Sequence, residues 1–155
     1  MTSAWTRETP IGPLTLTEEA GALTGVLFGS HAPQGALLAE TPLIRQAFEQ
    51  LEEYFRGERR AFDLPMDARG TPFQRRCWQA LLAIPYGQTR TYAQQAQAVG
   101  SPRACRAVGM ANHRNPLPVL IPCHRVVGAD GSLTGYAGGL RIKQMLLEIE
   151  QSRKG

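Results

Sequence analysis

The sequence predicts an α+β fold in which a small β-sheet-plus-helix domain precedes a mostly helical domain that contains a helix-turn-helix. Residues 4–29 alternate apolar and β-branched polar side chains between turns rich in Gly and Pro, which is typical of half-buried strands. From residue 71 onward apolar residues recur at helical spacing, and prolines stand where helices are expected to begin. We therefore expect one domain over residues 1–68 and a second over residues 69–155.

The first domain is expected to hold three strands and one helix. The strands are expected at residues 5–9, 14–17 and 23–28. Residues 30–41 have the composition of a loop. A helix is expected over residues 42–56, because apolar residues recur every four positions there and Gly57 follows the end. No arrangement of side chains in this domain suggests chemistry.

The second domain is expected to consist mainly of helices. Thr71-Pro72 can cap and open a helix that ends before Pro85, and Thr91 can cap a short helix through Val99. Ser101-Pro102 repeats the pattern at the start of a helix expected over residues 102–112. Two short helices joined by a Gly-containing turn are typical of a helix-turn-helix. An amphipathic helix is expected over residues 140–150, with Ile142, Met145, Leu146 and Ile149 facing inward.

Composition excludes several classes of protein. Of the 155 residues 43% are apolar and 19% are charged, which is enough for a packed core and excludes a disordered chain. No run of about 18 apolar residues exists, and the first residues lack the pattern of a signal peptide, so we expect a cytoplasmic protein. The three cysteines lack the spacing of a disulfide framework or a zinc site, and no nucleotide-binding glycine motif occurs. We therefore expect no metal and no cofactor.

Charge is distributed unevenly along the chain. Residues 1–69 hold six basic and ten acidic side chains, whereas residues 70–155 hold eleven basic and three acidic ones. A half with an excess of eight positive charges favours a polyanionic partner, and together with the helix-turn-helix it favours DNA.

Cys123 is the candidate nucleophile. It follows a segment with three prolines within residues 116–122, which cannot form a helix and is expected to be extended and partly buried. The thiolate is the reactive form of cysteine, and the adjacent His124 and Arg125 supply positive charge that favours it. Cys77, on the apolar face of a helix, is expected to be a buried and inert thiol.

A relay to this thiol can be assembled from the same half of the chain. Neighbouring side chains of an extended segment point to opposite faces, so His124 is expected to act on the sulfur through a bridging water. Glu150 can orient His124 and complete a Cys–His–Glu arrangement. A Gly-rich loop at residues 134–139 can approach a ligand closely.

The segment Pro122-Cys123-His124-Arg125-Val126 resembles the active-site motif of the O6-alkylguanine-DNA alkyltransferases, also called methylated-DNA–protein-cysteine methyltransferases. The resemblance extends from Thr71-Pro72-Phe73 through Tyr92, Arg106 and Asn115-Pro116 to the closing helix. It implies a ribonuclease H-like first domain and a second domain that binds double-stranded DNA carrying O6-alkylguanine, with O4-alkylthymine as a second candidate lesion. It also implies repair by one alkyl transfer per molecule, by a monomer.

The resemblance implies roles for individual residues. Cys123 would accept the alkyl group, while His124 and Glu150 would make its thiolate. Tyr92 would protonate the departing guanine, and Asn115 would act as a hinge. Arg106 would fill the space of a nucleotide flipped out of the duplex. Further DNA contacts are implied at Thr71, Thr91, Tyr92, Ala104, Cys105 and Ala107. The alkylguanine pocket implied is formed by Pro118, Val126, Tyr136, Ala137 and Gly138.

Two residues depart from the pattern of the family. Ala137 stands where many relatives have serine, so a hydroxyl contact to O6 is lost while the backbone N–H remains. Cys105 stands where a small residue is common, and two interpretations stay open: a harmless substitute for alanine or a second oxidisable thiol.

Three other functions stay open on the residues alone. The first is a non-catalytic protein that binds alkylated DNA and flags it for another pathway. Such proteins lack the active-site cysteine that is present here. A transcription regulator would need base-reading side chains where this sequence has alanines. A thiol hydrolase would use Cys123, His124 and Glu150 but would not need the basic half.

Overall fold

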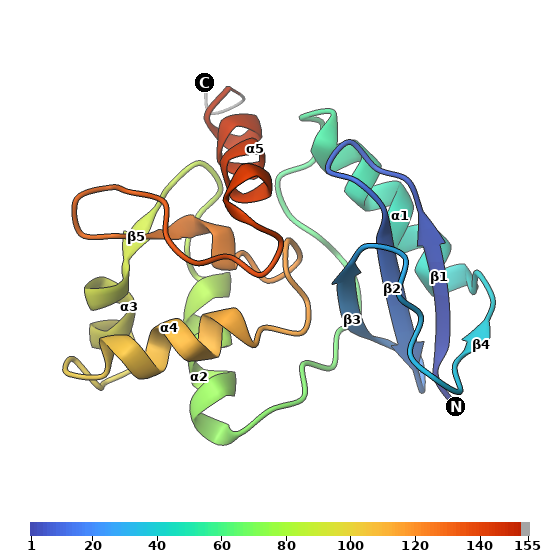
Figure 1. Cartoon of the computed structure of the whole chain (residues 1–155), viewed down its shortest axis with the longest axis horizontal. Helices are drawn as coiled ribbons and strands as arrows, with labels where there is room; N and C mark the ends of the chain where they lie inside the picture. The colour runs from blue at the N-terminus through green and yellow to red at the C-terminus, as the bar shows by residue number, and fades with distance from the viewer. Residues whose placement is uncertain (153–155) are drawn as a thin grey trace. The chain divides into compact units, whose positions relative to one another are not determined.

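Four strands form a single sheet in the first unit of the chain, residues 1–69 (Figure 1). The structure is a computed structural model that describes residues 1–152. The strands are β1 (Ser3–Arg7), β2 (Leu14–Glu19), β3 (Ala22–Phe28) and β4 (Leu37–Leu38), in the order β3-β2-β1-β4. The first three pair antiparallel, and β4 pairs parallel with β1. The three expected strands are confirmed, with β1 two residues earlier than predicted. The sequence did not predict β4, because two exposed residues carry no periodic pattern.

Helix α1 (Pro42–Phe55) packs against β1, β2 and β3. It begins as predicted, because the hydroxyl of Thr41 accepts a hydrogen bond from the backbone N–H of Ile44. Phe48 and Leu51 of the helix and Leu16 of the sheet are almost completely buried, so this interface is the core of the unit.

The second unit begins at Gly70, and its described part, to residue 152, holds four α-helices, one short 3₁₀ turn and a two-stranded sheet. The helices are α2 (Pro72–Leu82), α3 (Tyr92–Ala98), α4 (Cys105–His113) and α5 (Leu140–Ser152). Strand β5 (Arg90–Thr91) pairs parallel with β6 (Val126–Val127), which joins the start of α3 to the segment after Cys123. The α+β class with a helical second domain is confirmed. Within residues 1–152, no helix combines the length and the apolar composition that crossing a bilayer requires.

Helices α3 and α4 form the predicted helix-turn-helix, but α4 begins later than the sequence predicted. The expectation that Ser101-Pro102 opens the helix is wrong, because the backbone N–H of Ala104 bonds the carbonyl of Ser101 at 2.9 Å and closes a turn. Proline suits the second position of a turn as well as the first turn of a helix, so the pattern alone does not distinguish them.

Two buried amides hold these helices together. Gln95 of α3 and Asn112 of α4 exchange hydrogen bonds of 2.9 and 2.7 Å. Gln95 also donates to the carbonyl of Cys77 in α2. The indole N–H of Trp78 in α2 donates to the carbonyl of Ala111 at 2.8 Å. All three helices are therefore joined by directional bonds as well as by apolar packing.

The segment before Cys123 is buried as predicted but is not extended. Leu117, Val119 and Ile121 are at most 2% exposed. The backbone N–H of Ile121 bonds the carbonyl of Leu117 at 2.8 Å, and Val119 has a φ of +72°. Prolines exclude a helix here but leave room for successive tight turns, which the chain adopts.

The closing helix presents a different face from the predicted one. Its buried side chains are Lys143, Leu146 and Glu150, whereas Ile142, Met145 and Ile149 are half-buried. These three buried positions follow the spacing of one helical stripe, so two charged residues lie on the inner face. The prediction counted only apolar residues, so the inner face that it gave is rotated about the helix axis from the observed one.

Candidate functional site

Cys123 lies at the first position of a short 3₁₀ turn, Cys123–Arg125, and is 7% exposed. Asn115, just after α4, holds the approach to this turn: its side-chain N–H donates to the carbonyl of Ile121 at 2.9 Å, and its side-chain oxygen accepts from the N–H of Leu117 at 3.0 Å. Burial raises the pKa of the Cys123 thiol to about 11, against a hydrogen bond from Asn115 and the charge of Lys143, which act to lower it. Burial outweighs these two groups, and neither His124 nor Arg125 is among the groups that lower this pKa, so the prediction that His124 and Arg125 favour the thiolate is not supported.

His124 and Glu150 form a buried pair next to the thiol. His124 Nε2 lies 2.7 Å from Glu150 Oε2, and the two side chains are 0% and 1% exposed. Burial lowers the pKa of His124, so the imidazole is neutral near pH 7. Burial opposes ionisation of Glu150, but hydrogen bonds from His124 and Arg125 lower its pKa to about 2. A carboxylate can only accept, so Nε2 carries the proton and Nδ1 keeps the lone pair of a base.

Arg125 serves the carboxylate rather than the sulfur. Its Nε and Nη2 donate to the two oxygens of Glu150 at 2.8 and 3.1 Å, and its Nη1 donates to the carbonyl of Ile84 at 2.7 Å. The prediction that Arg125 supplies charge to Cys123 is therefore not supported by these contacts. A 3₁₀ turn advances about three residues per turn, so neighbouring side chains diverge and the guanidinium reaches α5.

Lys143 is a site residue that the sequence did not predict. It is completely buried, and its Nζ donates to the carbonyls of Val126 at 2.6 Å and Thr134 at 2.8 Å. Burial lowers its pKa, and the charge of Cys123 acts in the opposite direction. The detectable pattern was its spacing from Leu146 and Glu150, which places all three on one helix face.

A hollow of about 650 Å³ lies beside the helix-turn-helix. It is lined by Tyr92, Cys105, Arg106, Gly109, Met110, His113, Thr134 and Gly135. Three predicted site residues, Tyr92, Cys105 and Arg106, therefore share one surface. The hydroxyl of Tyr92 accepts a hydrogen bond from Thr134 Oγ1 at 2.9 Å, which leaves the phenolic hydrogen for another acceptor.

The remaining predicted contacts fall into two groups. Thr71 and Thr91 cap α2 and α3, and their hydroxyls accept from the N–H groups of Gln74 and Gln94. Ala104 is the N-cap residue of α4, and Ala107 is exposed on the same helix.

The predicted pocket residues differ in burial. Pro118, Val126 and Tyr136 are buried, Gly138 is half-buried and Ala137 is exposed. Burial raises the pKa of Tyr136 well above its ordinary value, so this phenol stays protonated.

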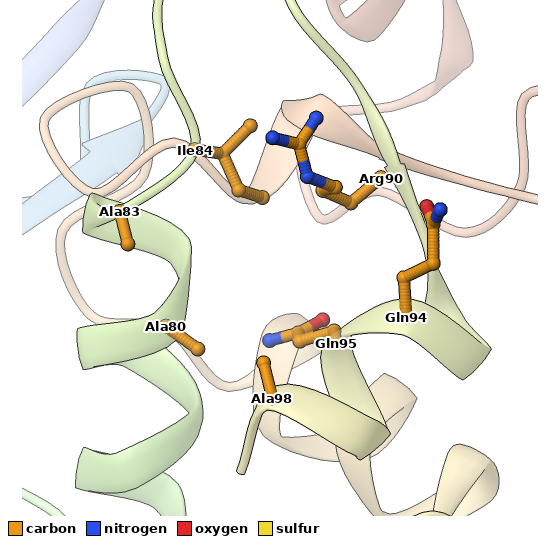
Figure 2. A pocket seen from close by; sticks show the side chains of 7 residues that line it. All are labelled: Ala80, Ala83, Ile84, Arg90, Gln94, Gln95 and Ala98. Atoms are coloured by element: carbon orange, nitrogen blue, oxygen red, sulfur yellow. The ribbon is translucent and has the colours of Figure 1, made fainter.

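A second, smaller pocket of about 210 Å³ lies between α2 and α3 (Figure 2). Ala80, Ala83 and Ala98 form much of its wall, and Arg90 extends across the opening from the side of β5. Its lining includes no cysteine, histidine or carboxylate, so we do not assign the chemistry to it. Within residues 1–152 no cluster of three or more His, Cys, Asp or Glu side chains is arranged to hold a metal ion.

A buried thiol, a neutral imidazole oriented by a carboxylate, and a helix-turn-helix beside an open hollow define a DNA-binding protein that performs thiol chemistry. Residues 72–152 match the family described as "6-O-methylguanine DNA methyltransferase, DNA binding domain", and residues 5–68 match its "ribonuclease-like domain". The chain belongs to the 6-O-methylguanine DNA methyltransferase family.

Individual relatives support the same assignment. The chain is 49% identical over 154 residues to the constitutive methylated-DNA–protein-cysteine methyltransferase of Bacillus subtilis, covering 94% of this chain and 93% of the relative. The crystal structure of the Mycobacterium tuberculosis O6-methylguanine methyltransferase superposes with a TM-score of 0.91 at 46% identity, over 99% of this chain and 94% of that one. A structure of the M. tuberculosis protein in complex with DNA also has a TM-score of 0.91, at 46% identity, over 97% of this chain and 94% of that one.

Proposed function

We propose that this protein repairs duplex DNA by transferring an alkyl group from O6 of guanine to Sγ of Cys123, once per molecule. The observation that carries the proposal is the buried Cys123 beside a His124–Glu150 pair 2.7 Å apart, on a turn that is paired through β6 and β5 to the start of the helix-turn-helix. Membership in the 6-O-methylguanine DNA methyltransferase family supports the same reaction.

Proton transfer begins at the thiol. His124 Nδ1 takes the proton of Cys123, through a water molecule, and Glu150 stabilises the imidazolium that results. The new S–C bond forms as the C–O6 bond breaks, and the electron pair of that bond stays on guanine. Tyr92 gives its phenolic proton to guanine N3. Solvent then returns a proton to the Tyr92 phenolate and takes one from the His124 imidazolium. The net change is one proton lost by the thiol and one proton gained by guanine.

The lesion has to leave the duplex before this reaction. The alkyl carbon of a stacked guanine is out of reach of a side chain that is 7% exposed. Arg106, exposed on α4 and on the rim of the hollow, fills the vacated space, while the small side chains of Ala104 and Ala107 allow α4 to approach the minor groove. Cys105, Thr71 and Thr91 contribute contacts at the same interface. Asn115 couples this helix to the turn that holds the nucleophile.

The flipped guanine is held by backbone groups and small side chains. The N–H groups of the loop around Tyr136 and Ala137 donate to O6, and Pro118 and Gly138 line the alkyl group. The carbonyls of Cys123 and Val126 accept the exocyclic amine. The Val126 carbonyl already accepts from Lys143, and a carbonyl oxygen has a second lone pair for the amine.

The product limits the protein to one reaction. A thioether on an sp³ carbon has no acyl group to hydrolyse, so the cysteine is not regenerated. A protein that reacts once with damaged chromosomal DNA is expected to work as a monomer in the cytoplasm, on the nucleoid where the cell is prokaryotic.

The test is the intact mass of the protein after incubation with a duplex that contains O6-methylguanine. The expected result is a gain of one methyl group that stops at one equivalent, is found on Cys123, and is absent in Cys123→Ser. Cys77→Ala, which removes a buried thiol of α2 that has no part in the proposed reaction, is the matched control and is expected to react like the wild type. Tight binding to the lesion without any gain would overturn repair in favour of recognition alone.

A further inference from the structure

Lys143 is buried without a carboxylate as its hydrogen-bond partner. Its side chain is 0% exposed, and both hydrogen bonds of its ammonium go to backbone carbonyls, at 2.6 Å to Val126 and 2.8 Å to Thr134. A buried charge is costly unless it is paired or well hydrogen-bonded. The one buried carboxylate nearby on α5, Glu150, is already bound by His124 and Arg125. Among the described residues 1–152, no acidic side chain therefore accepts a hydrogen bond from Lys143.

The two carbonyls belong to the turn that carries the nucleophile and to the loop beside the hollow. The proposed reaction needs these two parts of the chain in fixed relative positions. Val126 directly follows the turn that carries the nucleophile, and its N–H donates to the carbonyl of Cys123. Thr134 belongs to the loop that lines the hollow, and its hydroxyl donates to the hydroxyl of Tyr92 at 2.9 Å. One ammonium thus connects the end of the nucleophile turn, through Thr134, to the proposed proton donor.

We propose that Lys143 is a positioning residue for alkyl transfer, which ties the nucleophile turn to the loop that orients Tyr92 and places a positive charge where the Cys123 thiolate forms. The inference rests on the proposed function. Lys143 keeps its protons throughout the reaction and neither donates nor accepts one. It acts by stabilising negative charge on sulfur once His124 has removed the thiol proton, and by holding Thr134 so that the hydrogen of Tyr92 points to the guanine.

The electrostatics are consistent with this placement. The charge of Lys143 lowers the pKa of Cys123 against burial, and it also contributes to the lowered pKa of His124. The other titratable groups around the sulfur are His124 on its own turn, Glu150 on α5 and Tyr136 on the loop. Glu150 is ionised above about pH 2, and Tyr136 stays protonated far into the alkaline range. A shift that appears in both the transfer profile and the alkylation of Cys123 by a small reagent is therefore assigned to Cys123, because the second reaction does not use Tyr92.

The test compares Lys143→Gln with the wild-type protein. Gln keeps a hydrogen-bond donor for the carbonyls but carries no charge. Two rates are measured from neutral to alkaline pH: single-turnover transfer from an O6-methylguanine duplex, and alkylation of Cys123 by iodoacetamide. We expect both profiles of Lys143→Gln to move to higher pH by about one unit, which lowers both rates at neutral pH about tenfold, with duplex affinity unchanged. Arg141→Gln, which removes an exposed charge from the same helix, is expected to leave both profiles in place.

A uniform loss of rate without a shift in either profile, or no loss at all, would overturn the role of Lys143. Thr134→Val tests the positioning part independently, including the case in which Lys143 variants do not fold. It removes the hydrogen bond to Tyr92 and keeps the carbonyl, so transfer to Cys123 is expected to slow about tenfold while the iodoacetamide profile stays in place. Equal transfer rates for Thr134→Val and wild type would overturn the positioning role. Failure of the wild-type protein to accept a methyl group would instead overturn the proposed function itself.

Discussion

Glu150 is the residue on which the site depends most. Its partners include the permanently charged guanidinium of Arg125 and the titratable imidazole of His124, and the backbone N–H of Gly87 also donates to it at 3.4 Å. Because the hydrogen bonds from His124 and Arg125 keep the carboxylate ionised, the carboxylate fixes which nitrogen of His124 carries the proton. The same pair therefore orients the base for the reaction and contributes to the stability of the second unit.

Acid should destabilise the protein through this residue. The pKa of Glu150 falls from 4.5 to about 2 on folding, so its contribution to stability is present above pH 4.5 and is lost as pH falls toward 2. The pKa of His124 is also lowered from 6.5, so the unfolded chain binds an extra proton below that pH and stability begins to decline there. We expect Glu150→Gln to lower the free energy of unfolding by roughly 3 kcal/mol at pH 7, and to flatten its decline below pH 4.5.

Urea unfolding followed by circular dichroism across this pH range measures both effects. The exposed Glu148 on the same helix is the control, and Glu148→Gln is expected to change little. Equal effects of the two substitutions at pH 7 would show that the buried network contributes no particular stability.

Residue by residue, the nucleophile could be predicted from the sequence and its electrostatic setting could not. Cys123, His124 and Glu150 stand out by type, and the structure brings them together. The partner of Arg125 and the burial of Lys143 depend on the rotation of α5 against the nucleophile turn. Charged residues such as Lys143 and Glu150 are seldom fully buried, so their type predicts exposure. They are buried here because the folded chain supplies their hydrogen-bond partners, which the sequence does not show.

At the scale of elements, a pair of buried amides, Gln95 and Asn112, holds the helix-turn-helix together. Gln95 and Asn112 are 2% and 8% exposed and exchange two hydrogen bonds between α3 and α4. Removing one partner leaves the other buried without its bond, whereas removing both leaves less polar surface unsatisfied. The two amides therefore add directional bonds to the apolar packing between α3 and α4.

A double-mutant cycle tests the coupling between Gln95 and Asn112. We expect Gln95→Leu and Asn112→Leu each to lower the free energy of unfolding by about 1–3 kcal/mol, and the double variant to lose clearly less than the sum. Gln79→Leu, at an exposed position of α2, is the control for the substitution itself. Strict additivity in urea unfolding would contradict a coupled pair.

Element boundaries could be predicted where a side chain ends or begins the helix. Thr71 and Thr91, which the sequence analysis named as caps, accept from backbone N–H groups at the starts of α2 and α3. Thr41 does the same at the start of α1, which was predicted from apolar spacing alone. Helix α4 has no side-chain cap, so no residue type marked its start. The turns before Cys123 depend on a positive φ at Val119, which a β-branched residue adopts only when its surroundings require it.

At the scale of the whole molecule, charge is divided between the two units. Acidic and basic side chains pair on the first unit, for example Arg7 with Glu40 and Arg69 with Glu19. The second unit has three acidic residues, one of them the buried Glu150; Arg125 and Lys143 are buried too, but the exposed arginines still outnumber the two exposed acidic side chains. Its exposed arginines include Arg75, Arg76, Arg103, Arg106 and Arg114. This division predicts that one unit binds the phosphate backbone and the other does not.

Salt should therefore slow repair of a duplex without slowing the chemistry. At protein concentrations below saturation, the transfer rate from an O6-methylguanine duplex is expected to fall steeply as salt rises, because each phosphate contact releases counterions. The rate with free O6-methylguanine base is expected to change little.

Arg106→Ala and Arg103→Ala each remove one exposed charge, and we expect each to reduce the salt slope by about one. Only Arg106→Ala should slow transfer from duplex at saturating protein, because it removes the side chain that replaces the flipped nucleotide. Equal transfer rates for the two variants under those conditions would contradict that role and leave Arg106 as a phosphate contact.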